Sequence, residues 1–129
     1  MAKILIVEDN ALNIKLFCDL LAAHGHEPQV VTDSRQALDA ARECVPDLGI
    51  TDILLPHVSG LELIHLIRED EALKAVPIMA VTAYASIGDD ERIREAGAES
   101  YVTKPISVAR FVAEVDSLLE RKQPAEAKV

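Results

Sequence analysis

Five residues of types that can do chemistry together stand at the ends of short apolar runs in this sequence. They are, in chain order, Glu8, Asp9, Asp52, Thr82 and Lys104. If the apolar runs are parallel strands of one sheet, their carboxyl ends meet at one edge, where ligand sites of such sheets form. The sequence therefore predicts that three carboxylates, one hydroxyl and one ammonium group share a single rim.

Three carboxylates at one rim repel each other, and a bound cation is the usual compensation. Mg2+ suits such a rim because it takes few carboxylates and keeps waters and a phosphate oxygen as its other ligands. A carboxylate is also a nucleophile that can accept a phosphoryl group as an acyl phosphate. Phosphoryl transfer needs mainly positioning and charge stabilisation, which Lys104 and a hydrogen bond from Thr82 can add to the cation.

Each residue also has an ordinary structural explanation when it is taken alone. An acid before a helix is usually a cap or a first-turn charge. A threonine at a strand end is usually a good strand residue, and a lysine before proline is usually solvated. The functional interpretation rests on coincidence, because all five follow the carboxyl ends of the predicted strands.

The elements that must position these residues alternate along the chain. Near-continuous Ile, Val and Leu without polar alternation is typical of strands buried on both faces. The predicted strands are Ile4–Val7, Pro28–Val31, Leu48–Thr51, Ile78–Val81 and Tyr101–Thr103. Predicted helices lie between and after them; they begin at Asn10, at Asp33 or Ser34, at Ser59, at Ser86 and at Ser107. We expect Gly25 and Gly97 to end the first and fourth helices, and the last helix to bury an apolar side made of Val108, Phe111, Val112, Val115, Leu118 and Leu119.

This alternation predicts an α/β fold, a doubly wound five-stranded parallel sheet with helices on both faces. The 129 residues fit one domain, which we place at residues 1–121. The polar residues 122–129 are expected to form a disordered tail.

Composition narrows the classes of partner. The formal net charge is −9, and an acidic chain repels nucleic acid and anionic lipid. The first apolar run is too short for a signal peptide or a membrane span, so we expect a cytoplasmic protein without membrane insertion. Cys18 and Cys44 have no metal-binding or redox spacing and are expected to be half-buried, reduced side chains.

At these residues the chain resembles the receiver domains of bacterial two-component signalling. The resemblance spans residues 3 to 120. Its motifs are Ile6-Val7-Glu8-Asp9-Asn10, Asp47-Leu48, Asp52, Leu55-Pro56, Ser59-Gly60, Val81-Thr82-Ala83 and Lys104-Pro105. A narrower likeness to single-domain regulators of cell division implies a role in cell-cycle or cell-polarity control.

The resemblance implies the strand order 2-1-3-4-5 and makes Asp52 the phosphoacceptor. It also implies that Mg2+ is held by Asp9, Asp52 and the backbone carbonyl of Leu54. Glu8 stands where most receivers have Asp, and we expect it to act on the metal through water. Such a protein is not an enzyme in the ordinary sense, because it catalyses only its own phosphorylation and dephosphorylation.

The same resemblance assigns a conformational switch. Thr82 and Lys104 would be its hydroxyl and ammonium groups, and Tyr101 its aromatic residue. Without the resemblance, Tyr101 could equally be a plain aromatic residue of an edge strand. The Lys104–Pro105 bond is expected to be cis, which X-Pro bonds tolerate at low cost.

Partners follow from the family as well. Histidine kinases or bifunctional kinase-phosphatases would meet the first helix and the loop after the fifth strand, and a phosphotransfer protein is a further candidate. The first helix carries two apolar stripes, one of them with Leu12, Leu16 and Leu20. They form either a broad core face or a core face with an exposed flank that docks a partner. Output through protein contacts is expected, from a monomer or a phosphorylation-dependent dimer.

Three other functions remain as alternatives. An aspartate-nucleophile phosphatase would need a nucleophile and a general acid two residues apart after the first strand, whereas Glu8 and Asp9 are adjacent. A flavodoxin-like module would need a phosphate cradle, which the segment 53–60 lacks. A non-phosphorylated pseudo-receiver would only dock partners, and the complete acid, Thr and Lys set argues against it.

Overall fold

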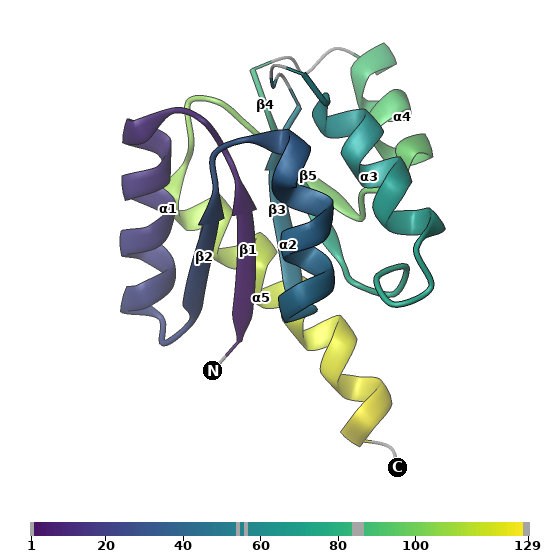
Figure 1. Ribbon diagram of the computed structural model, residues 1–129. Helices are drawn as coiled ribbons and strands as arrows, with labels where there is room; N and C mark the ends of the chain where they lie inside the picture. The colour runs from purple at the N-terminus through teal and green to yellow at the C-terminus, as the bar shows by residue number, and fades with distance from the viewer. Residues whose placement is uncertain (1, 54, 56, 84–86, 128–129) are drawn as a thin grey trace.

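The computed structural model describes the backbone of residues 2–53, 55, 57–83 and 87–127, and their side chains except those of 87–90 and 121–127. Strands and helices alternate from end to end (Figure 1). The strands are β1 (Lys3–Val7), β2 (Glu27–Val31), β3 (Leu48–Asp52), β4 (Ile78–Thr82) and β5 (Ser100–Thr103). The helices are α1 (Ala11–Ala23), a 3-10 turn η1 (Ser34–Gln36), α2 (Ala37–Cys44), α3 (Gly60–Glu69), α4 (Ile87–Ala96) and α5 (Val108–Ala127).

The strands form one parallel sheet in the order β2-β1-β3-β4-β5, as predicted. Helices cover both of its faces, with α1 and α5 on one side and α2, α3 and α4 on the other (Figure 1). The strand order reverses at β1, because β2 lies on one side of β1 and β3 on the other. In sheets of this kind the carboxyl ends of the two strands at the reversal, here β1 and β3, flank a crevice. This crevice is where the sequence places the acidic residues.

Local signals fix several of the element boundaries. The Asn10 side chain caps α1 by accepting a hydrogen bond from the Asn13 amide at 3.0 Å. The Ser59 hydroxyl caps α3 in the same way at 3.2 Å. Gly25 and Gly97 follow α1 and α4 with φ of 82° and 118°, conformations that side chains with a Cβ disfavour. These predictions are confirmed.

Each face of the sheet has its own apolar core. On one side Phe17 of α1 stacks on Phe111 of α5 with ring centroids 4.9 Å apart, over strand residues such as Ile6 and Ile50. On the other side α3 contributes Leu63, Ile64 and Ile67, whereas the buried residue that α4 contributes among its described side chains is Ile93. The helix α4 is therefore the less deeply anchored of the two.

Two details differ from the sequence expectation. The segment after Asp33 begins as a 3-10 turn, and α2 proper starts only at Ala37. Val108 was expected on the apolar side of α5 but is 49% exposed, because it lies in the first turn, beyond the end of the sheet. The backbone of α5 is helical to Ala127, and the end of the domain at residue 121 stays a prediction.

Among the residues that the structure describes, no helix is both long and apolar enough to cross a membrane.

Candidate functional site

The register of the sheet brings the predicted site residues to one rim. Val7, the last residue of β1, pairs with Thr51 of β3, so Glu8 and Asp9 leave β1 beside Asp52. Lys104 follows β5, and its amide donates a hydrogen bond of 2.7 Å to the carbonyl oxygen of Thr82. All five residues therefore lie at the carboxyl ends of strands, as the sequence predicted.

The acidic side chains form a compact cluster. Carboxylate oxygens of Glu8, Asp9 and Asp52 all lie within 4.8 Å of one another. Glu8 and Asp52 are buried, and Asp9 is exposed at the surface. The cluster is thus open on one side and closed on the other, which suits a cation that must also meet a ligand from solvent.

Burial raises the pKa of the Glu8 carboxyl, and the nearby Asp52 charge adds to this effect. One Glu8 oxygen, Oε1, accepts a hydrogen bond from the Asn10 amide at 3.1 Å. The other, Oε2, is buried and has no hydrogen-bond partner among the described residues. A buried oxygen without a partner costs free energy, so Oε2 has capacity for a further ligand, such as a water on a metal ion.

Lys104 is the cation of the cluster. Its Nζ lies 2.6 Å from Asp52 Oδ2 and 3.8 Å from Glu8 Oε2. Partial burial alone would lower the pKa of Lys104, but the hydrogen bond to Asp52 and the charges of the three acids raise it. Lys104 is therefore held as an ammonium group and compensates one of the three carboxylates. The oxygen-only donor set and the remaining negative charge fit Mg2+.

The other expected residues surround this cluster. Thr82 is buried at the end of β4. Tyr101 is half-buried on β5 and packs against the core beneath α4. The Lys104–Pro105 peptide bond is cis. Leu54, whose carbonyl was expected on the metal, lies outside the described residues.

A residue that the sequence did not single out by itself also shapes the site. Gly60, the first residue of α3, lies against the backbone of Asp52, and its amide donates a hydrogen bond of 2.9 Å to the carbonyl of Ile53. A Cβ at this position would lie 2.2 Å from the carbonyl oxygen of Asp52. The nearby Ser34 hydroxyl is buried and accepts a hydrogen bond of 3.1 Å from the Val58 amide. Both residues hold the segment after β3 against its surroundings, a role that only the three-dimensional packing reveals.

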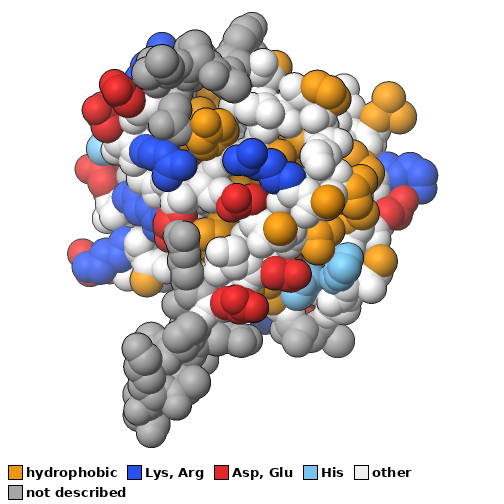
Figure 2. Space-filling model, turned by 180° about the vertical axis from the view of Figure 1, so that it is seen from behind, with side chains coloured by type: hydrophobic (Ala, Val, Ile, Leu, Met, Phe, Trp, Pro, Cys, Tyr) orange, Lys and Arg blue, Asp and Glu red, His pale blue; other side chains and the backbone are white. Residues whose placement is uncertain are grey.

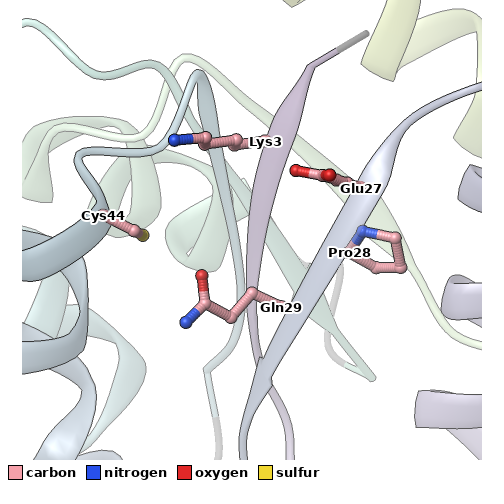
Figure 3. A pocket seen from close by; sticks show the side chains of 5 residues that line it. All are labelled: Lys3, Glu27, Pro28, Gln29 and Cys44. Atoms are coloured by element: carbon pink, nitrogen blue, oxygen red, sulfur yellow. The ribbon is translucent and has the colours of Figure 1, made fainter.

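A separate hollow of about 230 Å³ lies at the opposite end of the sheet. It is lined by Lys3, Glu27, Pro28, Gln29 and Cys44, which come from the first halves of β1 and β2 and from the end of α2 (Figure 3). Burial raises the pKa of the Cys44 thiol, which disfavours the reactive thiolate. The residues that line the hollow therefore include no acidic cluster like that of the rim and no activated nucleophile.

Residues 4–116 match the family model described as response regulator receiver domain. The chain belongs to this family. As a receiver domain of a response regulator, it works with histidine kinases or phosphotransfer proteins and is not a classical enzyme.

Individual relatives agree with this membership. The receiver domain is 52% identical over 116 residues to the polar-differentiation response regulator DivK of Brucella ovis. The matched region covers 90% of this chain and 94% of that protein.

Two solved structures have the same fold. The receiver domain of the sensor histidine kinase PA1611 of Pseudomonas aeruginosa, with a magnesium ion in its active site cleft, is 34% identical, has a TM-score of 0.80 and covers 93% of this chain and 95% of that one. The BeF3-activated receiver domain of Klebsiella pneumoniae RstA is 27% identical, has a TM-score of 0.84 and covers 91% of this chain and 97% of that one. Both comparisons extend over nearly the whole receiver domain.

Proposed function

We propose that Asp52 accepts a phosphoryl group from a phosphohistidine of a histidine kinase, and that Mg2+ bound at the acidic cluster is required. The observation that carries the proposal is the position of Asp52, which lies 2.6 Å from the Lys104 ammonium inside a cluster of three carboxylates. The phosphorylated protein then signals through contacts with other proteins.

The transfer needs little covalent chemistry from the protein. A carboxylate oxygen of Asp52 attacks phosphorus and forms the acyl phosphate, while the phosphorus–nitrogen bond of the donor breaks and the histidine keeps the electron pair. The ammonium group of Lys104 stabilises the negative charge on the phosphoryl oxygens. The hydroxyl group of Thr82, buried at the end of β4, donates a hydrogen bond to the bound phosphoryl group.

Asp9 and Asp52 would hold the metal directly, together with the carbonyl of Leu54. Glu8 would contact it through a water, since its buried Oε2 has no hydrogen-bond partner among the described residues. When it is bound, Mg2+ neutralises charge between the carboxylates and the incoming phosphoryl group. The magnesium ion recorded in the cleft of the PA1611 receiver domain supports this assignment.

The phosphoacceptor is tested by labelling with radioactive acetyl phosphate in the presence of Mg2+. The wild type should form an acyl phosphate that hydroxylamine cleaves, and Asp52→Asn should form none. Asp33→Asn is the matched control, because Asp33 also follows a strand but bonds Arg35 outside the cluster. Equal labelling of the wild type and Asp52→Asn would refute the assignment.

We also propose that the kinase docks beside the rim on α1 and on the loop that leads into α5. Leu12, in the first turn of α1, is 80% exposed, and Val108 at the start of α5 is 49% exposed. Apolar side chains form a broken band over the face that carries these two helices (Figure 2). Of the two interpretations of the α1 stripes, the exposure of Leu12 favours the exposed flank.

The choice of phosphoryl donor separates an effect on kinase docking from an effect on the transfer reaction itself. Leu12→Asp should slow phosphotransfer from a purified histidine kinase but leave labelling by acetyl phosphate unchanged, because the small donor needs no protein surface. Leu66→Asp is the control, since Leu66 is 39% exposed on α3, across the sheet. If Leu12→Asp reduces labelling by both donors equally, the docking assignment is wrong.

The relative from Brucella ovis is named as a regulator of polar differentiation. We propose that this protein likewise acts in cell-cycle or cell-polarity control. Cells in which Asp52→Asn replaces the wild type should show altered division or polarity. Normal division and polarity in those cells, with the variant present at wild-type level, would argue against this role.

A phosphatase remains the alternative of a different class. The rim offers no acid two residues after Asp9 or Asp52, where such an enzyme would need its general acid. Sustained turnover of a simple phosphate ester, many product molecules per protein, would favour that alternative.

A further inference from the structure

A positively charged side chain of α4 covers the aromatic residue of β5. The guanidinium carbon of Arg94 lies 5.7 Å from the centroid of the Tyr101 ring. At this distance a cation is attracted by the negative face of the ring. Arg94 is an exposed residue, whereas the Tyr101 ring beneath it is half-buried and packs against the core.

The backbone beneath Arg94 is fixed by contacts of its own. Arg68 of α3 donates two hydrogen bonds, of 2.9 and 2.7 Å, to the carbonyl of Gly97, which directly follows α4. The neighbouring Ile93 is buried in the core. Arg94 therefore projects from the anchored end of α4, and its position over Tyr101 is set by the fold.

Tyr101 in turn lies on the same face of the sheet as Thr82. Tyr101 pairs with Ala80, and Thr103 pairs with Thr82, so all four side chains share one face. Thr82 lies two residues beyond Ala80 on the same strand, nearer the rim. Tyr101 is thus the diagonal neighbour of Thr82 on this face, a distance that an aromatic side chain can reach, so a rearrangement of Thr82 around a phosphoryl group can act on its ring.

We infer that Arg94 is a positioning residue of the switch: it holds the Tyr101 ring in its half-buried position beneath α4 and so opposes an activated state in which the ring moves away from the guanidinium. This inference rests on the proposed function, because it needs a phosphoryl group at Asp52 that shifts Thr82 and Tyr101. A contact made in one of two states biases the equilibrium toward that state. Removal of the guanidinium should therefore raise the affinity for a phosphoryl mimic.

The expected change is modest. A cation over an aromatic ring at an exposed site is worth about the free energy of a two- to fivefold change in an equilibrium constant. We expect Arg94→Met to bind beryllofluoride, in the presence of Mg2+, about two- to fivefold more tightly than the wild type. Arg94→Lys keeps a cation over the ring and should bind as the wild type does.

The test uses the full chain labelled with 3-fluorotyrosine and followed by fluorine NMR, with Tyr101→Phe to assign the resonance. Beryllofluoride titrations give the affinity, and the Tyr101 resonance reports the environment of the ring. In Arg94→Met without ligand, this resonance should move toward its ligand-bound position. Arg92→Met is the matched control, because it removes the same charge from the exposed surface of the same helix.

Two results would overturn the inference. The first is an affinity and a resonance in Arg94→Met equal to those of the wild type. The second is an equal change in Arg92→Met, which would show a general effect of charge. Both differ from a failure of the proposed function, in which the wild type itself would not bind beryllofluoride or would bind it equally well as Asp52→Asn.

Discussion

A single methyl group at Gly60 should displace the proposed phosphoacceptor. The Cβ of an alanine there would lie 2.2 Å from the carbonyl oxygen of Asp52, 2.6 Å from the Cα of Ile53 and 2.9 Å from the carbonyl carbon of Asp52. All three atoms are backbone, so no side chain can rotate away to make room. Either the start of α3 or the end of β3 must move.

The size of the movement follows from these contacts. Carbon atoms in ordinary contact are about 3.5 Å apart, so relief of the clash needs a shift of about 1 Å. A misplacement of this size can cost about 100-fold in rate at a reacting group. Overpacking of a tight site also costs about 1–3 kcal/mol of stability. We therefore expect Gly60→Ala to lower both the phosphorylation rate and the stability of the fold, with the larger relative loss in the phosphorylation rate.

The assay is the rate of labelling by acetyl phosphate, with urea unfolding followed by circular dichroism as the measure of stability. Gly25→Ala is the matched control: Gly25 has a φ of 82°, so alanine is strained there, but nothing lies within 4 Å of its Cβ and the site is far along the chain. It should lose about 1 kcal/mol of stability and keep the wild-type rate. A folded Gly60→Ala protein that is labelled at the wild-type rate would refute the positioning argument.

Three further predictions concern stability, the end of the chain and the metal. Arg68→Met should cost about 2–4 kcal/mol in urea unfolding, because it removes a guanidinium that bonds the carbonyls of two loops and Glu99. Arg42→Met, at a more exposed ion pair, should cost under about 1 kcal/mol, and similar losses in both variants would contradict this prediction. A chain ending after Arg121 should keep its stability within about 0.5 kcal/mol, since residues 122–129 were expected to lie outside the domain, and a larger loss would place them inside it. Asp9→Ala should abolish Mg2+-dependent labelling and Glu8→Ala should weaken it less; labelling that survives EDTA would remove the case for a metal.

The sheet and the rim could be predicted because their signals are local. Runs such as Ile4–Val7 have few ways to bury every side chain other than a central strand. The caps at Asn10 and Ser59 act within three residues of themselves. Once the strands are parallel, the rule that their carboxyl ends share an edge gathers Asp52 and Lys104 without further information.

The contacts that surround the rim could not be predicted in this way, because they join residues far apart in the sequence. Arg68 bonds Gly97 across 29 positions, and an arginine in a helical sequence gives no sign of such a partner. The exposure of Leu12 was left open for a similar reason. An apolar stripe on a helix has the same pattern whether a neighbouring element covers all of it or only part of it.

These contacts also indicate which part of the molecule can respond to a phosphoryl group. The side of the sheet under α1 and α5 is held by the stacked rings of Phe17 and Phe111, both fully buried in the core. The helix α4 is held differently, by Ile93 and by the hydrogen bonds of Arg68 at its carboxyl end. Thr82 ends β4, and the next helix along the chain is α4, which begins at Ile87. Because a two-state change follows the contacts that cost least to break, the proposed signal should leave the rim on the α4 side of the sheet, with the contact between Arg94 and Tyr101 setting how readily it does so.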